Sequence, residues 1–119
     1  MRALMTDTVL YRFADPASLA AASASGEFRG EALDEQDGFI HLSTRTQLAD
    51  TLDAHFAGVD RIALAEIDGA HIADIVKWEV SRGGERFPHA YGAIPFSAIE
   101  TVYLLRRGED GAWQWPEAL

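Results

Sequence analysis

Apolar and polar residues alternate along several short segments of the chain, and this pattern predicts half-buried β-strands. The opening segment, Thr8 to Ala14, is rich in the β-branched and aromatic residues that favour strands. Further segments of this kind are predicted at 40–43, 61–67, 73–80, 87–93, 101–106 and 112–115. The dipeptide Asp110-Gly111 predicts a hairpin before the last of them.

Two segments in the first half have helical features. The alanine-rich run 17–25 follows Asp15, a favourable N-cap residue. The second predicted helix, 44–56, begins with Thr44 three residues before Gln47, which is the spacing of a capping box. Helices gathered in the first half and strands in the second predict an α+β fold, with antiparallel or mixed strand pairing.

Size and composition bound the class of protein. With 119 residues and 48% hydrophobic residues, we expect one globular domain over 1–119. Cysteine is absent, which excludes disulfides, thiolate metal sites and cysteine nucleophiles. No apolar run approaches the roughly 18 residues that span a bilayer, and residues 1–8 lack the apolar core of a secretory signal. We therefore expect a cytoplasmic protein without a membrane partner.

The charge balance restricts the partners. A formal net charge of -9 argues against extended nucleic-acid binding, which needs a surplus of cations. Lys77 is the single lysine, and the other cations are arginines, which suit planar, bidentate recognition of anions. Genomic base composition would favour arginine equally well. A local positive pocket on an acidic protein stays open, and the sequence does not predict an oligomeric state.

The most informative stretch, Gly38 to Thr44, is a predicted strand that carries a histidine and runs directly into a helix. Phe39, His41 and Ser43 share one face of this strand. Burying an unpaired histidine costs about 1–3 kcal/mol. His41 is therefore either a core histidine with hydrogen-bond partners or a ligand-binding residue. Ser43 either makes a helix-start or loop hydrogen bond or helps to orient a ligand.

A second histidine has a comparable setting in the segment 87–92. Its aromatic side chains, His89 and Tyr91 among them, share a face that could hold a planar ring or cap a core. Glu79 either forms an ion pair with Lys77 on a sheet face or serves as the carboxylate of a cleft. The two histidine segments together predict a polar cleft between strands.

The other candidate groups carry weaker signals. None of the four histidines has HxxxH or HExxH spacing, so no metal site is predicted. There is no GxSxG nucleophile motif either. His55 is predicted to pack along an apolar helix stripe, and His71 to be exposed. The loop 82–86 contains Gly83-Gly84, and is either a solvated connection or a loop that closes on an anionic ligand.

Taken together, these motifs resemble a small bacterial family, the domain of unknown function 952 family, over about residues 8–111. The matching segments are Leu10 to Arg12, Asp37 to Thr44 with Gln47, Leu64 to Ile67, Lys77 to Glu79, and Phe87 to Gly92. The chain departs from the family pattern at Arg12, where a histidine is common, and at Leu19, where a tryptophan is usual.

That family resembles, in fold, the ADP-ribosyltransferase superfamily, which grips NAD in the cleft of a split mixed sheet and includes RNA 2′-phosphotransferases. The resemblance implies a mixed, split β-sheet with two N-terminal helices. It implies that His41 bonds the ribose, that Tyr91 stacks on nicotinamide and that Glu79 is the catalytic carboxylate. Arg12 would pair a phosphate.

The leading hypothesis is therefore a cleft that binds NAD or an ADP-ribose-like nucleotide, with a glycosyl, ADP-ribosyl or RNA 2′-phosphate transfer activity. Its predicted lining residues are Arg12, His41, Ser43, Glu79, His89 and Tyr91. NAD would be a substrate, and no resident cofactor is predicted. The rival hypothesis is a nonenzymatic nucleotide-sensing or protein-interaction module, and a third is a degenerate relative whose polar residues only support the core.

Overall fold

The computed structural model describes residues 9–119. Thr8, the first residue of the predicted opening strand, and the rest of segment 1–8 lie outside the described residues. The α-helices are α1 (Pro16–Ser25), α2 (Ala32–Asp37) and α3 (Leu48–His55). The strands are β1 (Val9–Ala14), β2 (Glu27–Phe28), β3 (Ile40–His41), β4 (Arg61–Asp68), β5 (Val76–Val80), β6 (Arg86–Ala90), β7 (Ile94–Pro95), β8 (Ile99–Arg107) and β9 (Trp113–Gln114).

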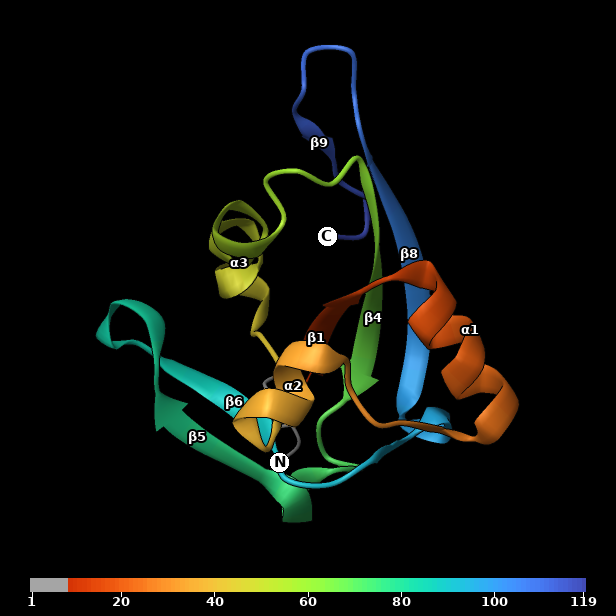
Figure 1. Cartoon of the computed structure of the whole chain (residues 1–119), viewed down its shortest axis with the longest axis vertical. Helices are drawn as coiled ribbons and strands as arrows, with labels where there is room; N and C mark the ends of the chain where they lie inside the picture. The colour runs from red at the N-terminus through yellow and green to blue at the C-terminus, as the bar shows by residue number, and fades with distance from the viewer. Residues whose placement is uncertain (1–8) are drawn as a thin grey trace.

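The strands form three sheets. The largest has four strands in the order β1-β4-β8-β9, a three-stranded sheet has the order β3-β6-β5, and β2 pairs with β7. Figure 1 shows β4 and β8 side by side in the centre and the β5–β6 hairpin projecting at the lower left. A bridge between Tyr11 of β1 and Ser43, just beyond β3, joins the edge of the four-stranded sheet to the three-stranded sheet.

The core lies on both faces of the four-stranded sheet. On one face, α1 contributes Leu19 and Ala22 to a cluster that contains the small side chains Ala63 and Ala65 of β4. On the other face, the buried Leu52 of α3 belongs to a cluster built around the inward-facing residues of β1, β4 and β8. Alternate residues of the same strands supply the two clusters, as the period of a strand requires. Each buried leucine of this kind stabilises the fold by about 1.5–3 kcal/mol.

Local sequence signals set the boundaries of most elements. Asp15 caps α1 by accepting a hydrogen bond from the Ala17 N–H at 2.9 Å, and Gly26 ends the helix in the left-handed conformation at a φ of 96°. The predicted capping box of Thr44 and Gln47 is present. The predicted hairpin at Asp110-Gly111 connects β8 to β9. The helices and separate antiparallel sheets confirm the prediction of an α+β fold.

Several predictions about local structure were wrong. All strand pairings in the described part of the chain are antiparallel, so the sheets are split but not mixed. The segment Ala73–Ile75 forms a 3₁₀ turn instead of extending β5. The sequence pattern indicates no regular element in segment 27–37, but the structure has β2 and the helix α2 there. Contacts with Arg12 of β1 hold α2 in place.

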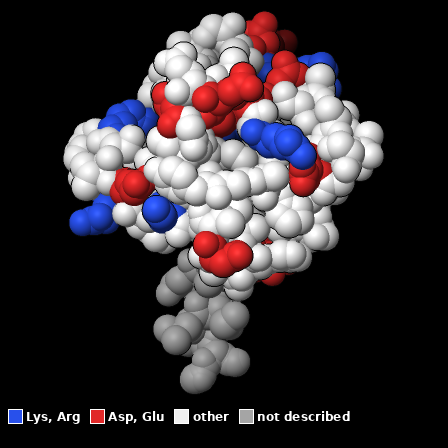
Figure 2. Space-filling model, turned by 60° about the horizontal axis from the view of Figure 1, so that its bottom comes forward, with Lys and Arg blue, Asp and Glu red and all other residues white. Residues whose placement is uncertain are grey.

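The molecular surface carries its charges in separate groups. Figure 2, which brings the bottom of the molecule forward, shows acidic and basic side chains gathered in small clusters with uncharged surface between them. Within residues 9–119, none of the helices combines the length and the apolar character that crossing a membrane would require.

Candidate functional site

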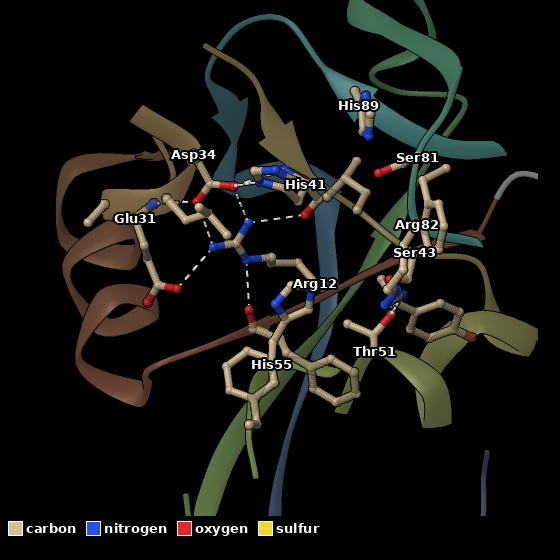
Figure 3. A pocket seen from close by; sticks show the side chains of 17 residues that line it. Arg12, Glu31, Asp34, His41, Ser43, Thr51, His55, Ser81, Arg82 and His89 are labelled. Carbon is tan, nitrogen blue, oxygen red and sulfur yellow. Dashed lines mark hydrogen bonds and ion pairs between the residues drawn. The ribbon is translucent and has the colours of Figure 1, made fainter. Parts of the chain in front are cut away.

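A cavity of about 360 Å³ lies between the edge strand β1 and the three-stranded sheet. Six parts of the chain contribute to it: β1, the beginning of α2, the segment around β3, α3, the loop before β6, and β6 itself. Its polar and charged lining residues are Tyr11, Arg12, Glu31, Asp34, His41, Ser43, Thr51, His55, Ser81, Arg82 and His89. Figure 3 shows the lining side chains and labels all of these residues except Tyr11.

The two predicted histidine segments meet in this cavity. His41 of β3 and His89 of β6 are direct partners in an antiparallel ladder, which places both side chains on the same face of the sheet. Their ring centroids are 5.9 Å apart, and both rings line the cavity. The structure thus brings together the two segments that the sequence singled out.

Arg12 is bonded to its surroundings by its whole guanidinium group. Its side chain donates two hydrogen bonds to the Asp34 carboxylate, at 2.6 and 2.7 Å, and one to Glu31 at 2.9 Å. It donates two more to the carbonyl oxygens of Phe13 and His41. A guanidinium has five N–H groups, so Arg12 has no donor left for a ligand in this conformation.

Asp34 is the buried centre of this network, with only 2% of its surface exposed. Besides the Arg12 bonds, its carboxylate accepts the backbone N–H groups of Glu31 and His41 and faces the His41 Nδ1 at 2.7 Å. Burial opposes the charged form, but the hydrogen bonds from His41 and Arg12 outweigh it and hold the pKa of Asp34 well below its usual range. Asp34 is therefore ionised at neutral pH.

His41 is held between two carboxylates. Its Nδ1 faces Asp34, and its Nε2 faces Asp37 at 2.8 Å at the exposed rim of α2. The hydrogen bond to Asp34 raises the pKa of His41, against the opposing effect of burial, and Asp37 raises it further. A histidine with a carboxylate acceptor at each nitrogen is suited to the charged, doubly protonated form.

The raised pKa of His41 predicts a pH dependence of stability. A group whose pKa is higher in the folded state stabilises fully below its unfolded pKa, about 6.5, and this contribution is lost as the pH rises through the folded value. In urea unfolding from about pH 6 to about pH 9, we expect the stability difference between the parent and His41→Gln to shrink as the pH rises. The exposed His71→Gln serves as the control; a difference that is independent of pH would contradict the ion-pair assignment.

His89 is held by a hydrogen bond to a carboxylate and by a stacked aromatic ring. Its Nδ1 is 2.7 Å from Glu79 Oε1, and the same carboxylate oxygen accepts the hydroxyl of Tyr91 at 2.7 Å. The ring of Phe39 stacks on the imidazole with a centroid distance of 4.0 Å. The hydrogen bond from Tyr91, and then that from His89, lowers the pKa of Glu79. His89 is thus oriented by a carboxylate that lies outside the cavity.

Arg82 enters the cavity from the loop before β6. Its Nη2 donates to the Thr51 hydroxyl at 3.0 Å, and its guanidinium lies 4.8 Å from the centroid of the Phe87 ring. Its Nη1 is buried and has no hydrogen-bond partner. The Thr51 hydroxyl also donates to the Gln47 carbonyl at 2.9 Å, and the Ser43 hydroxyl is 3.2 Å from it.

Four of the six predicted lining residues line the cavity, namely Arg12, His41, Ser43 and His89. Glu79 and Tyr91 are absent from the lining. The Glu79 side chain is 40% exposed, and its carboxylate contacts His89 Nδ1 from outside the cavity. The ion pair with Lys77, one of the two alternatives for Glu79, is not formed; Lys77 lies 4.9 Å from the Tyr91 ring centroid instead.

Sequence reasoning missed Asp34, Thr51 and His55 as lining residues. His55 is exposed at the cavity and does not pack along an apolar stripe. Arg82 was not predicted individually; its loop, 82–86, was interpreted either as a solvated connection or as a loop that closes on an anionic ligand. Asp34 carried one usable signal, because it stands three residues after Glu31 and the two form a capping box.

The fold and cavity define a small α+β protein with antiparallel sheets and a two-histidine site. The chain belongs to the family described as protein of unknown function (DUF952), whose model matches residues 13–102. None of the curated proteins compared with the chain matches it.

The chain is also similar to solved structures of protein CC0527 from Caulobacter crescentus. Its crystal structure is 37% identical in sequence with a TM-score of 0.83, over 90% of this chain and 94% of that chain. Its solution NMR structure is 38% identical with a TM-score of 0.76, over 87% of this chain and 90% of that chain.

Proposed function

We propose that the cavity binds a small anionic ligand of the nucleotide class, such as NAD, ADP-ribose or a mononucleotide. The observation that carries this proposal is the guanidinium of Arg82, which lines the cavity with Nη1 unpartnered. A buried donor without an acceptor costs about 1–3 kcal/mol, more for a charged group, and a phosphate oxygen would satisfy it. The hydroxyl of Ser43 would supply a further donor, whereas that of Thr51 already donates to the Gln47 carbonyl and accepts from Arg82.

The electrostatics of the cavity support an anionic ligand. Burial lowers the pKa of His55, and the positive charges of Arg82, His41 and Arg12 lower it further. Cations from three separate elements therefore act on one point beside the cavity. Glu31 and Asp34 neutralise Arg12 and Asp37 faces His41, so Arg82 is the cavity cation that forms no ion pair among residues 9–119.

This proposal gives the phosphate contact to Arg82 and a positioning role to Arg12. The predicted Arg12–phosphate contact would require Arg12 to release a bond to Asp34, Glu31 or a carbonyl oxygen. Arg82 gives up no hydrogen bond at Nη1, although this atom is enclosed and a ligand oxygen reaches it only when the loop shifts. The neighbouring Gly83 and Gly84, both at positive φ, give its loop freedom to adjust around a ligand.

The size and aromatic lining of the cavity fit a planar ring. Its volume of about 360 Å³ lies at the lower end of the range for small-molecule sites and suits a mononucleotide-sized group. Aromatic side chains surround it: Tyr11, Phe13, Phe56 and Phe87. These rings take over the stacking role that the resemblance assigned to Tyr91.

Binding is favoured over ADP-ribosyl transfer by the position of the carboxylates. Transfer through an oxocarbenium-like state needs a carboxylate near the ribose, and Glu79 is outside the cavity lining. The carboxylates inside it, Glu31 and Asp34, are committed to Arg12. This observation favours the alternative hypothesis of nucleotide binding without loss of nicotinamide.

Thermal melting with AMP, ADP-ribose and NAD tests the proposal, with uncharged adenosine as the matched control. A ligand at 100 times its dissociation constant should stabilise the fold by about 2.7 kcal/mol. We expect stabilisation by a phosphorylated ligand and little or none by adenosine. An equal shift of the melting temperature with adenosine, or no shift with any of these ligands, would contradict the proposed anion site. Release of nicotinamide from NAD would restore the transferase hypothesis.

A further inference from the structure

The orientation of His89 suits a base that faces a ligand. Because Glu79 holds Nδ1, the neutral ring carries its proton there and presents the lone pair of Nε2. Nε2 has no hydrogen-bond partner within residues 9–119, and the ring lines the cavity while remaining 4% exposed. The stacked ring of Phe39 and the two flanking strands hold it in place.

The opposite ring, His41, suits an acid. Its Nδ1 is anchored to the buried Asp34, whereas its Nε2 faces Asp37 at the exposed rim. With Nδ1 held by Asp34 the direction of the Nε2–H is fixed, so a ligand oxygen receives this proton by taking the place of the Asp37 carboxylate, whose exposed side chain can turn away. The cavity therefore contains a base and an acid on directly paired strand positions, with ring centroids 5.9 Å apart.

We propose that this histidine pair catalyses the hydrolysis of a phosphodiester bond in a nucleotide bound at Arg82, an inference that rests on the proposed function. His89 Nε2 takes a proton from a water molecule, and the water oxygen forms the new bond to phosphorus. The bond from phosphorus to the leaving oxygen breaks, and that oxygen takes the proton from His41 Nε2. The net reaction adds water across one P–O bond, and exchange of protons with solvent restores both rings.

The neighbouring groups explain why phosphorus is the fitting centre. Arg82 offers an N–H to a non-bridging oxygen, in the manner in which guanidinium groups stabilise charge on phosphoryl groups. Arg82 lies over Phe87, two residues before His89 on the same face of β6, so a phosphate on Arg82 stands beside the base. Glu79 is a positioning residue in this scheme, because it acts through His89.

The test combines calorimetric binding with turnover on the same protein. Binding is measured with AMP, and hydrolysis with 2′,3′-cyclic AMP and bis(p-nitrophenyl) phosphate, in EDTA to suppress contaminating metal-dependent enzymes. We expect turnover by the parent and a loss of at least about 100-fold in His89→Gln, the size of a general-base contribution. In Glu79→Gln, kcat should fall with KM and the melting temperature unchanged. The exposed His71→Gln should retain full activity.

Each of the other outcomes contradicts a specific part of the proposal. AMP binding without turnover by the parent would overturn the hydrolytic inference and leave the proposed function standing. Turnover that survives in His89→Gln would overturn the assignment of the base, and a Glu79→Gln variant that changes only KM would overturn its positioning role. Absence of both binding and turnover would overturn the proposed function as well.

Discussion

Asn in place of Asp34 should lower the free energy of unfolding by about 3–5 kcal/mol, the cost of breaking a buried ion pair from one side. Arg12 is buried and donates two hydrogen bonds to this carboxylate. An asparagine amide would present N–H groups to the donors of Arg12 and of the Glu31 backbone. In the variant, the buried guanidinium of Arg12 loses the negative charge that neutralises it, and the amide N–H groups point at other N–H groups.

Urea unfolding at neutral pH measures this effect, and Asp37→Asn provides the matched control. Asp37 lies three residues further along the chain, is exposed and contacts only His41 in the same network. An exposed pair of this kind contributes about 0–1 kcal/mol. Equal losses in the two variants would show that burial of Asp34 does not set the strength of the network.

Glutamine in place of Arg82 is expected to weaken binding of ADP-ribose or AMP by about 10- to 100-fold. Hydrogen bonds to charged groups contribute about 1.5–3 kcal/mol, and each 1.4 kcal/mol changes a dissociation constant tenfold. The variant retains a donor amide for Thr51 but loses the positive charge of a guanidinium that lines the cavity. Isothermal titration calorimetry gives the two dissociation constants directly.

Arg86→Gln, at the start of β6, controls for the loss of one positive charge close to Arg82 in the chain. Arg86 is exposed and lies outside the cavity lining, where its side chain bonds only the carbonyl of Trp78 at 3.4 Å. We expect its dissociation constant to stay within about twofold of the parent, because exposed charges are screened by solvent. If Arg86→Gln weakened binding as much as Arg82→Gln, net charge and not the cavity would explain the affinity.

Local patterns predicted most helices and strands, because the boundaries of these elements depend mainly on residues that are close together in the sequence. Strand alternation located the long strand β4, and the cap at Asp15 located α1. The two histidine segments also predicted a shared polar cleft, but the register that sets His41 against His89 was not predicted.

The parts that could not be predicted depend on contacts between distant residues. Helix α2 has few apolar residues of its own and forms where Asp34 and Glu31 meet Arg12, about twenty residues away in sequence. Glu79 stands on the predicted strand face, but the hydrogen bonds to His89 and Tyr91 keep its carboxylate outside the cavity. No local pattern encodes such long-range choices of partner.

Histidine-ring ¹⁵N NMR during a titration with ADP-ribose tests the central claim most directly, because it observes the rings themselves. We expect the signals of His41 and His89 to move together along one saturable curve with a single dissociation constant. The signal of His71, which is exposed and outside the cavity lining, should stay in place. Rings of His41 and His89 that do not respond to ADP-ribose, AMP or NAD at millimolar concentration would contradict a shared nucleotide-binding cavity.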